Sequence, residues 1–113
     1  MLEVLRSWTM RGHPNLDDLG PALPREQWTL VDAVRHQAAV AGGRQFLSFE
    51  GGSSVSFSEF NDLTDRLGTA FSDLGVQPGD RVLGLLTNSR EFMLTMIATH
   101  KVGAVFVPIN TEL

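Results

Sequence analysis

The fold is decided by Leu74-Gly75-Val76-Gln77-Pro78-Gly79-Asp80-Arg81-Val82, followed by Asn88-Ser89-Arg90-Glu91-Phe92 and Gly103-Ala104-Val105-Phe106-Val107-Pro108. The first stretch ends a helix at its first glycine, turns at its Pro-Gly pair and begins an apolar strand. The second opens a new helix, with Asn88 or Ser89 as the N-cap. The third ends that helix at its glycine and forms a second apolar strand. Strand, helix and strand at this spacing predict a parallel βαβ unit.

The two strands, expected at Arg81–Leu86 and Ala104–Val107, are apolar at both alternate sets of positions. This pattern is typical of parallel strands that are covered on both faces. The sequence offers only two long helices and one shorter one to cover them, and the pair keeps at least one free edge. We therefore expect an incomplete sheet, with poor solubility or self-association through the exposed strand edge.

A small hairpin is expected upstream of this unit. Thr29 is a plausible N-cap of a helix that Gly42-Gly43 ends. Residues 44–50 then read as a short extended segment, and Gly51-Gly52-Ser53-Ser54 as a turn. Val55–Phe57 returns antiparallel, because glycine permits the positive φ angles of tight hairpin turns.

The best-specified element is the helix that follows. Ser56 and Glu59 stand at capping-box spacing, and Val55 and Phe60 are placed as a hydrophobic staple around the cap. Gly75 stands where a left-handed C-cap is expected. The predicted apolar face has helical spacing and consists of Phe60, Leu63, Leu67, Ala70, Phe71 and Leu74.

Composition limits the class of protein. The chain has 113 residues, 42% hydrophobic and 19% charged, which suits at most one globular domain. A net charge of −4 gives no electrostatic case for binding nucleic acid. There is no cysteine for disulfides or thiolate metal sites, and no apolar run long enough for a transmembrane segment. These features predict a soluble, cytoplasmic chain.

A phosphate-binding loop of the Walker type is absent from the sequence. Lys101 is the only lysine, and Val102 and Gly103 follow it in place of a hydroxyl residue. Gly51-Gly52-Ser53-Ser54 offers backbone amides but no lysine, so we interpret it as a plain hairpin turn.

The histidines give no metal or catalytic signature. His13, His36 and His100 are widely spaced, without the i,i+4 pairing of a zinc helix. We expect His36 on the exposed side of its helix and His100 toward an apolar face, as a packing residue.

The acidic residues Glu59, Asp62, Asp65 and Asp73 share one helix and fit a solvated face, with Asp62 and Arg66 at i,i+4 spacing. Met93 and Met96 fit a core, and Ser89 an N-cap in preference to a nucleophile. The Thr87-Asn88-Ser89 loop follows the carboxyl end of a parallel strand, where α/β proteins tend to bind ligands.

The chain resembles a known family over roughly Thr29 to Glu112. Val55-Ser56-Phe57-Ser58-Glu59-Phe60 is similar to the threonine-tyrosine-x-glutamate-leucine segment of the acyl-CoA synthetases and their adenylate-forming relatives, with serine and phenylalanine substituted. Leu74–Val82 is similar to their leucine-glycine-valine-x-proline-glycine-aspartate-x-valine segment and nearly complete. Further matches are Asn88, Glu91 and Phe92 in the next helix and Lys101–Asn110 in the strand and its exit.

The resemblance implies an α/β fold: the N-terminal portion of the adenylate-forming enzymes, with a small hairpin and a parallel βαβ unit flanked by helices. It divides the chain into an irregular N-terminal arm at 1–28 and a truncated AMP-binding subdomain at 29–113. It also implies a parent enzyme that uses ATP, Mg²⁺ and coenzyme A to convert a carboxylic acid to an acyl-adenylate and then to acyl-CoA.

The family's catalytic motifs come after the last residue here, so the resemblance carries over no catalytic, cofactor-binding or metal-ligating residue and implies no cofactor in this chain. We therefore expect an acyl-CoA ligase fragment that is inactive alone. The alternative is a stand-alone binding or assembly module derived from the same subdomain.

Overall fold

The computed structural model describes residues 24–112, with the side chain of Arg25 left out. The elements are η1 (Arg25–Gln27), α2 (Leu30–Ala41), β1 (Gln45–Ser48), β2 (Ser54–Ser56), α3 (Phe57–Asp73), β3 (Arg81–Gly84), α4 (Arg90–Lys101) and β4 (Val105–Pro108). Most of the predicted arm at 1–28 lies outside the described residues, and the part within them contains the short 3₁₀ helix η1.

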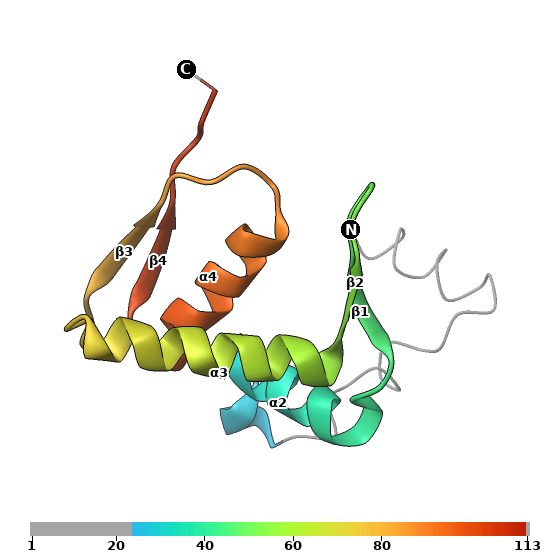
Figure 1. Cartoon of the computed structure of the whole chain (residues 1–113). Coiled ribbons are helices and arrows are strands. Elements are labelled where there is room, and N and C mark those ends of the chain that lie inside the picture. The colour runs from blue at the N-terminus through green and yellow to red at the C-terminus, as the bar shows by residue number, and fades with distance from the viewer. Residues whose placement is uncertain (1–23, 113) are drawn as a thin grey trace, which may run out of the picture.

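Helix α3 is the central element of the fold (Figure 1). The hairpin β1–β2 stands at its amino-terminal end and the pair β3–β4 rises at its other end. Both α2 and α4 pack against α3, and α4 also packs against β3 and β4. This arrangement confirms the predicted α/β class, with a small hairpin and a parallel pair flanked by helices.

The hairpin forms as predicted, with slightly different limits. β1 and β2 pair antiparallel, with Leu47 opposite Val55 and an irregularity between Gln45 and Leu47. The turn residue Gly51 has a φ of 69°, a conformation that glycine adopts at little cost. The return strand ends at Ser56, because that residue already caps the next helix.

The start of α3 is a complete capping box, as predicted. The backbone N–H of Glu59 donates to Ser56 Oγ at 3.2 Å, and the backbone N–H of Ser56 donates to Glu59 Oε2 at 2.8 Å. Val55 and Phe60, the predicted staple, are both buried in the core. Two of the helix's otherwise unpaired groups are satisfied by this exchange, which sets where the helix begins.

The end of α3 is a Schellman motif around Gly75. The N–H of Val76 donates to Phe71 O and the N–H of Gly75 donates to Ser72 O, both at 3.0 Å. Gly75 has a φ of 98°, which confirms the predicted left-handed cap. Gly103, with a φ of 77°, ends α4 in the same way.

The predicted parallel βαβ unit is confirmed. β3 and β4 pair in parallel, with Arg81 opposite Val105 and Gly84 opposite Pro108. The loop before β3 is fastened to the end of α4, because the N–H of Gly79 donates to Gly103 O at 2.9 Å. This hydrogen bond therefore holds the loop that leads into β3 against the turn that leads into β4.

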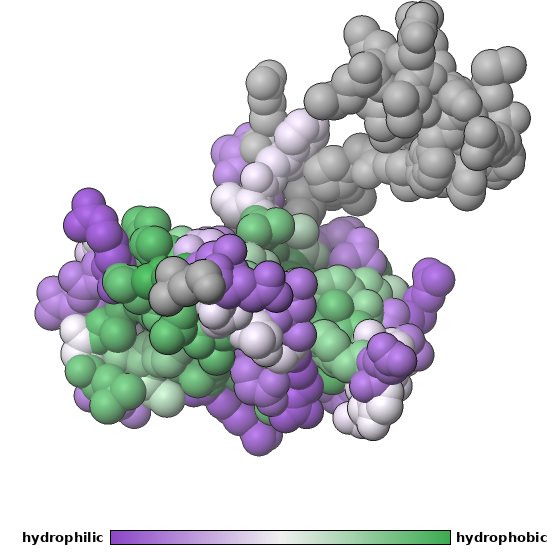
Figure 2. Space-filling view, turned by 90° about the horizontal axis from the view of Figure 1, so that it is seen from above, coloured by the Kyte–Doolittle hydropathy of each residue, from purple (hydrophilic) through white to green (hydrophobic). Residues whose placement is uncertain are grey.

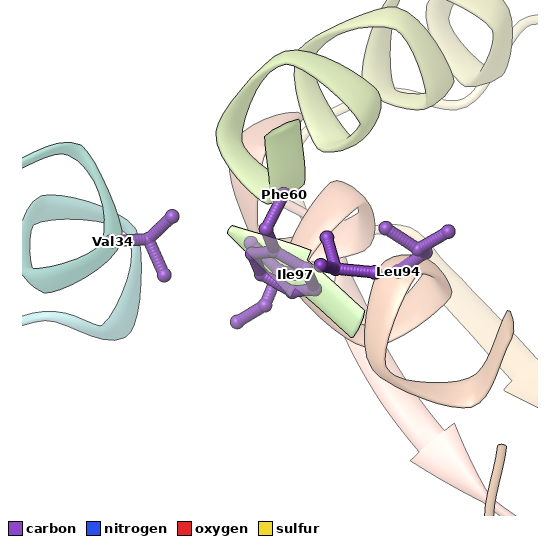
Figure 3. Close-up of a cluster of buried hydrophobic side chains, with 5 residues drawn as sticks. Val34, Phe60, Leu94 and Ile97 are labelled. Atoms are coloured by element: carbon purple, nitrogen blue, oxygen red, sulfur yellow. The ribbon is translucent and has the colours of Figure 1, made fainter. Parts of the chain in front are cut away.

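The core lies where the three long helices and the hairpin meet. Phe60 and Ile97 lie close together between α3 and α4, while Val34 projects toward them from α2 (Figure 3). Leu94 and Val55 complete this cluster, and the predicted core residues Met93 and Met96 pack against it half-buried.

The predicted apolar face of α3 is only partly right. Phe60 is fully buried and Leu63, Leu67 and Phe71 are half-buried, but Ala70 is exposed and Leu74 is 82% exposed. The buried stripe instead continues through Thr64 and Gly68. Thr64 can be buried because its hydroxyl donates to Phe60 O at 2.8 Å. Gly68 is buried because it faces α4: a Cβ there would lie at ordinary contact distance, 3.6 Å, from Ala98 O.

The strands β3 and β4 are covered on one face only within the described residues. The ring of Phe106 on β4 meets the ring of Phe92 on α4 edge-to-face at 5.4 Å. On the opposite face, Leu83 and Val105 are 63% and 51% exposed. The apolar pattern of these strands predicted cover on both faces, and the described chain supplies it on one.

Candidate functional site

The hollow at the carboxyl ends of β3 and β4 is the candidate site. Its position agrees with the sequence argument that singled out the Thr87-Asn88-Ser89 loop. Its volume is about 320 Å³ and its lining residues are Leu86, Thr87, Asn88, Phe92, Pro108, Ile109, Asn110, Thr111 and Glu112.

The two walls of this hollow come from the loops that follow β3 and β4. Parallel pairing places both loops at the same edge of the sheet, and the N–H of Ile109 donates to Gly84 O at 2.9 Å to hold them together. Ser89 caps α4 by accepting the N–H of Phe92 at 3.2 Å, so Ser89 is the cap and Asn88 is left to line the hollow.

Gly84 ends β3, shortly before the loop that lines the site. A Cβ there would lie 2.5 Å from the ring of Phe106, so only glycine allows this ring to pack across the strand pair against Phe92. Beyond it, the N–H of Glu112 donates to Asn110 Oδ1 at 2.9 Å and forms a local turn at the rim.

The chemistry of the hollow is that of a binding surface. Its apolar residues are Leu86, Phe92, Pro108 and Ile109, and its rim carries the hydroxyls and amides of two threonines and two asparagines. Among residues 24–112, Glu112 is the only charged residue in the lining. The described part of the lining holds no histidine, lysine or arginine.

The single lysine is a structural residue. Lys101 Nζ donates to Asn61 O at 3.1 Å, to Asn61 Oδ1 at 2.8 Å and to Asp65 Oδ1 at 2.6 Å. The Lys101 side chain is 4% exposed and that of Asp65 is 52% exposed. Its ammonium is fully engaged in joining α4 to α3, a role that the sequence reasoning missed. The sequence signal for this role is a single lysine at the end of one helix, together with acidic residues on the helix that packs against it.

The acidic face of α3 is arranged differently from the prediction. Asp65 pairs with Lys101, and the two ion pairs among the described residues do not include Asp62 with Arg66. The pKa of Glu59 is lowered below its usual 4.5, chiefly by the backbone hydrogen bond from Ser56 and further by the Ser56 side chain. The Glu59 carboxylate completes the cap of α3, and the Asp65 carboxylate joins α3 to α4. These two groups do not act as a paired acid and base.

The two described histidines, His36 and His100, lie apart from the candidate site. His36 is half-buried on α2, although the sequence predicted the exposed side of that helix. His100 is half-buried on α4 and borders a groove between α2 and α4 together with Lys101. His13 lies outside the described residues. Within residues 24–112, no three His, Asp or Glu side chains are grouped so that they could hold a metal ion.

The sequence pattern of the AMP-binding enzyme family matches residues 34–113. This chain belongs to that family. The curated relatives include crotonobetaine/carnitine--CoA ligase of Salmonella paratyphi B, 35% identical over 102 residues. That match covers 87% of this chain and 19% of the relative, so the chain spans about a fifth of the length of the curated relatives that it matches.

Solved structures of the AMP-binding enzymes agree with this assignment. The N-terminal domain of FACL13 from Mycobacterium tuberculosis is 34% identical, with a TM-score of 0.66, over 71% of this chain and 20% of that one. The anthranilate CoA ligase AuaEII, solved with anthranoyl-AMP, is 29% identical with a TM-score of 0.70 over 80% of this chain and 17% of its own. The chain therefore matches an N-terminal part of the AMP-binding enzymes.

The expected absence of catalytic, cofactor-binding and metal-ligating residues stays a prediction. The comparisons do not favour the alternative of a stand-alone module. None of the helices in the described part of the chain is long and apolar enough to span a membrane.

Proposed function

We propose that this chain is the amino-terminal scaffold of an ATP-dependent acyl-CoA ligase. In that reaction a carboxylic acid and ATP form an acyl-adenylate, from which coenzyme A then displaces AMP. The observation that supports the proposal most is the match of the family pattern to residues 34–113, together with relatives whose names are CoA ligases. The proposal includes a cytoplasmic location and a division into an arm at 1–28 and a subdomain at 29–113.

We expect this chain to lack a site for the phosphates of ATP and for Mg²⁺. Lys101 is the only lysine, and three acceptors on α3 already use its ammonium. No group of acidic residues is suited to a metal ion within residues 24–112. We therefore assign to this chain the role of forming and supporting a sheet, and we assign nucleotide chemistry to residues outside it.

A chimera tests this proposal. The 102 matched residues of the Salmonella crotonobetaine/carnitine--CoA ligase would be replaced by the corresponding residues of this chain, and AMP release would be measured with ATP, the acid substrate and coenzyme A. We expect the chimera to form acyl-CoA and the 113-residue chain alone to form none. A folded chimera without activity, or activity of the chain alone, would overturn the proposal.

A matched pair of variants in the chimera tests whether the packing of the β3–β4 pair is needed for folding and activity. Gly84→Leu would displace the ring of Phe106 on β4. Gly52→Leu adds the same side chain in the hairpin turn, where a Cβ has only ordinary contacts at 3.5 Å with Phe49. We expect the first to reduce both activity and folded yield and the second to change neither.

A further inference from the structure

A second hollow lies beside the exposed side of α3. Thr64 and Gly68 are buried, whereas Asp62 and Arg66 are exposed and lie one helical turn apart on the opposite side of the helix. The hollow lies between α3, the β1–β2 hairpin and the start of α4, and its volume is about 420 Å³. Pockets of this size hold small molecules in other proteins. We call it the α3 hollow.

The α3 hollow is lined by charged side chains of balanced sign. Glu59 and Asp62 on α3 are acidic, while Arg66 on α3 and Arg90 at the start of α4 are basic. Figure 2 shows hydrophilic residues in the middle of the view, where Figure 1 places α3 and α4. The two carboxylates would repel a ligand with negative charge alone, and the two guanidinium groups would repel one with positive charge alone. The lining therefore fits a ligand that carries both signs.

Three of these charged groups are available to a ligand. Neither Asp62 nor Arg66 takes part in an ion pair among the described residues, although their spacing would allow them to pair with each other. Arg90 approaches Glu91 through its Nε alone, at 3.9 Å, which is beyond hydrogen-bond distance. A guanidinium group can bind both oxygens of a carboxylate through two parallel hydrogen bonds. The two arginines can therefore bind a carboxylate, and Asp62 can accept from an ammonium group.

The α3 hollow also offers apolar and hydroxyl contacts. Val55 on β2 is buried, Leu63 on α3 is half-buried, and both line the hollow. Ser53 and Ser54 line it on the side of the hairpin. An apolar group that lies against Val55 and Leu63 would be removed from water, which favours binding. The ligand that fits this lining thus has an apolar body as well as two opposite charges.

We propose that the α3 hollow binds a small zwitterion, an α-amino acid with an apolar side chain. Arg66 and Arg90 bind its carboxylate, Asp62 binds its ammonium group, and Val55 and Leu63 contact its side chain. Among the described residues, this hollow shares no lining residue with the one at the carboxyl ends of β3 and β4. The proposal is therefore independent of the proposed function.

Calorimetric titration with three related ligands tests the proposal. L-Leucine carries both charges, 4-methylpentanoate keeps the carboxylate but lacks the ammonium group, and 3-methylbutylamine keeps the ammonium group but lacks the carboxylate. We expect saturable heat with leucine and binding at least about tenfold weaker with the other two, because each of them loses one charged contact. The titrations use the 113-residue chain and the chimera with the Salmonella ligase, without ATP or coenzyme A.

Two variants and two matched controls locate the binding. Asp62→Asn and Arg66→Gln each remove one charge from the hollow, whereas Asp73→Asn and Arg44→Gln remove the same charges from exposed residues outside it. We expect each of the first two to weaken leucine binding by about tenfold or more and neither control to change it. All four residues are exposed, so melting followed by circular dichroism should stay the same and separate lost binding from lost folding.

Three results would overturn the proposal. Absence of saturable leucine binding from both the chain and the chimera would leave the hollow as a solvated surface. Equal affinity for leucine and 4-methylpentanoate would mean that the ammonium group has no partner. Leucine binding that Asp62→Asn and Arg66→Gln leave unchanged would mean that the ligand occupies another site.

Discussion

Gly75 shows how a single backbone angle sets the end of α3. Its φ is 98°, and a Cβ at this position would have nothing within 4 Å. Any cost of adding a side chain therefore comes from the backbone conformation and not from a clash. Gly43 offers a matched comparison, because a Cβ there also meets nothing within 4 Å and its φ lies outside the left-handed region.

We expect Gly75→Ala to lower the free energy of unfolding by about 1 kcal/mol and Gly43→Ala to leave it unchanged or raise it. Urea unfolding of the dilute chain, followed by circular dichroism, measures both. Equal stability of the two variants would mean that α3 does not need a left-handed cap.

The buried ammonium of Lys101 predicts which substitution in the Lys101–Asp65 pair lowers the free energy of unfolding more. Asp65→Asn keeps the shape of the contact but leaves the nearly buried charge without its carboxylate. Lys101→Met removes the charge and fills the space with an apolar chain, and Asp65 is then half-exposed to water. Since an uncompensated buried charge is the costlier state, we expect Asp65→Asn to destabilise the chain by about 2 kcal/mol and Lys101→Met by less than about 1 kcal/mol. The reverse order in urea unfolding would contradict the assignment of Lys101 as a structural residue.

At the scale of elements, the capping box of α3 makes helix stability depend on pH. The folded pKa of Glu59 is lowered below its usual 4.5, mainly by the backbone hydrogen bond from Ser56. A lowered folded pKa means that the stabilisation is present above the unfolded pKa and is lost as the pH falls through the folded pKa.

We therefore expect Glu59→Gln to flatten the loss of stability between about pH 5 and pH 3, because glutamine can still accept in a capping box but does not titrate there. Unfolding by urea at several pH values compares the two proteins. Parallel stability curves for wild type and variant would show that Glu59 does not contribute as a carboxylate.

Local signals in the sequence predicted the elements well and the packing less well. The Ser56–Glu59 spacing and Gly75 set the ends of α3, and both devices act within one turn of the chain. The buried stripe of α3 was missed at Gly68 and overestimated at Leu74, because it depends on where α4 crosses. Helical periodicity ranks residues by hydrophobicity and does not show which of them lie under the neighbouring helix.

The candidate site was predicted in position but not in composition. The Thr87-Asn88-Ser89 loop could be found because ligands favour the carboxyl ends of parallel strands. Asn110, Thr111 and Glu112 on the opposite wall could not be assigned, because parallel register brings them there and no local pattern marks them. The contact of Lys101 with Asn61 and Asp65 depends in the same way on the packing of two helices, because the residues that it joins are 36 or more positions apart in the chain.

In the described part of the molecule, the helix ends and turns are well formed, but the β3–β4 sheet is covered on one face only. Thr29, Ser56 and Ser89 all cap their helices as expected, yet Leu83 and Leu85 remain mostly exposed. We propose that a chain of this kind acts as a scaffold in an AMP-binding enzyme. The central claim is that it supports the fold of such an enzyme but does not itself bind the nucleotide.

Calorimetric titration of the 113-residue chain with Mg-ATP tests that claim most directly. Its only lysine is engaged with α3, and the described residues offer no group for a metal ion. We expect no saturable heat with the chain alone. The chimera with the Salmonella ligase, titrated under the same conditions, should bind Mg-ATP and so serves as the positive control. Saturable binding of Mg-ATP by the chain alone would contradict the account and would make the Gly51-Gly52-Ser53-Ser54 turn the first place to look for the site.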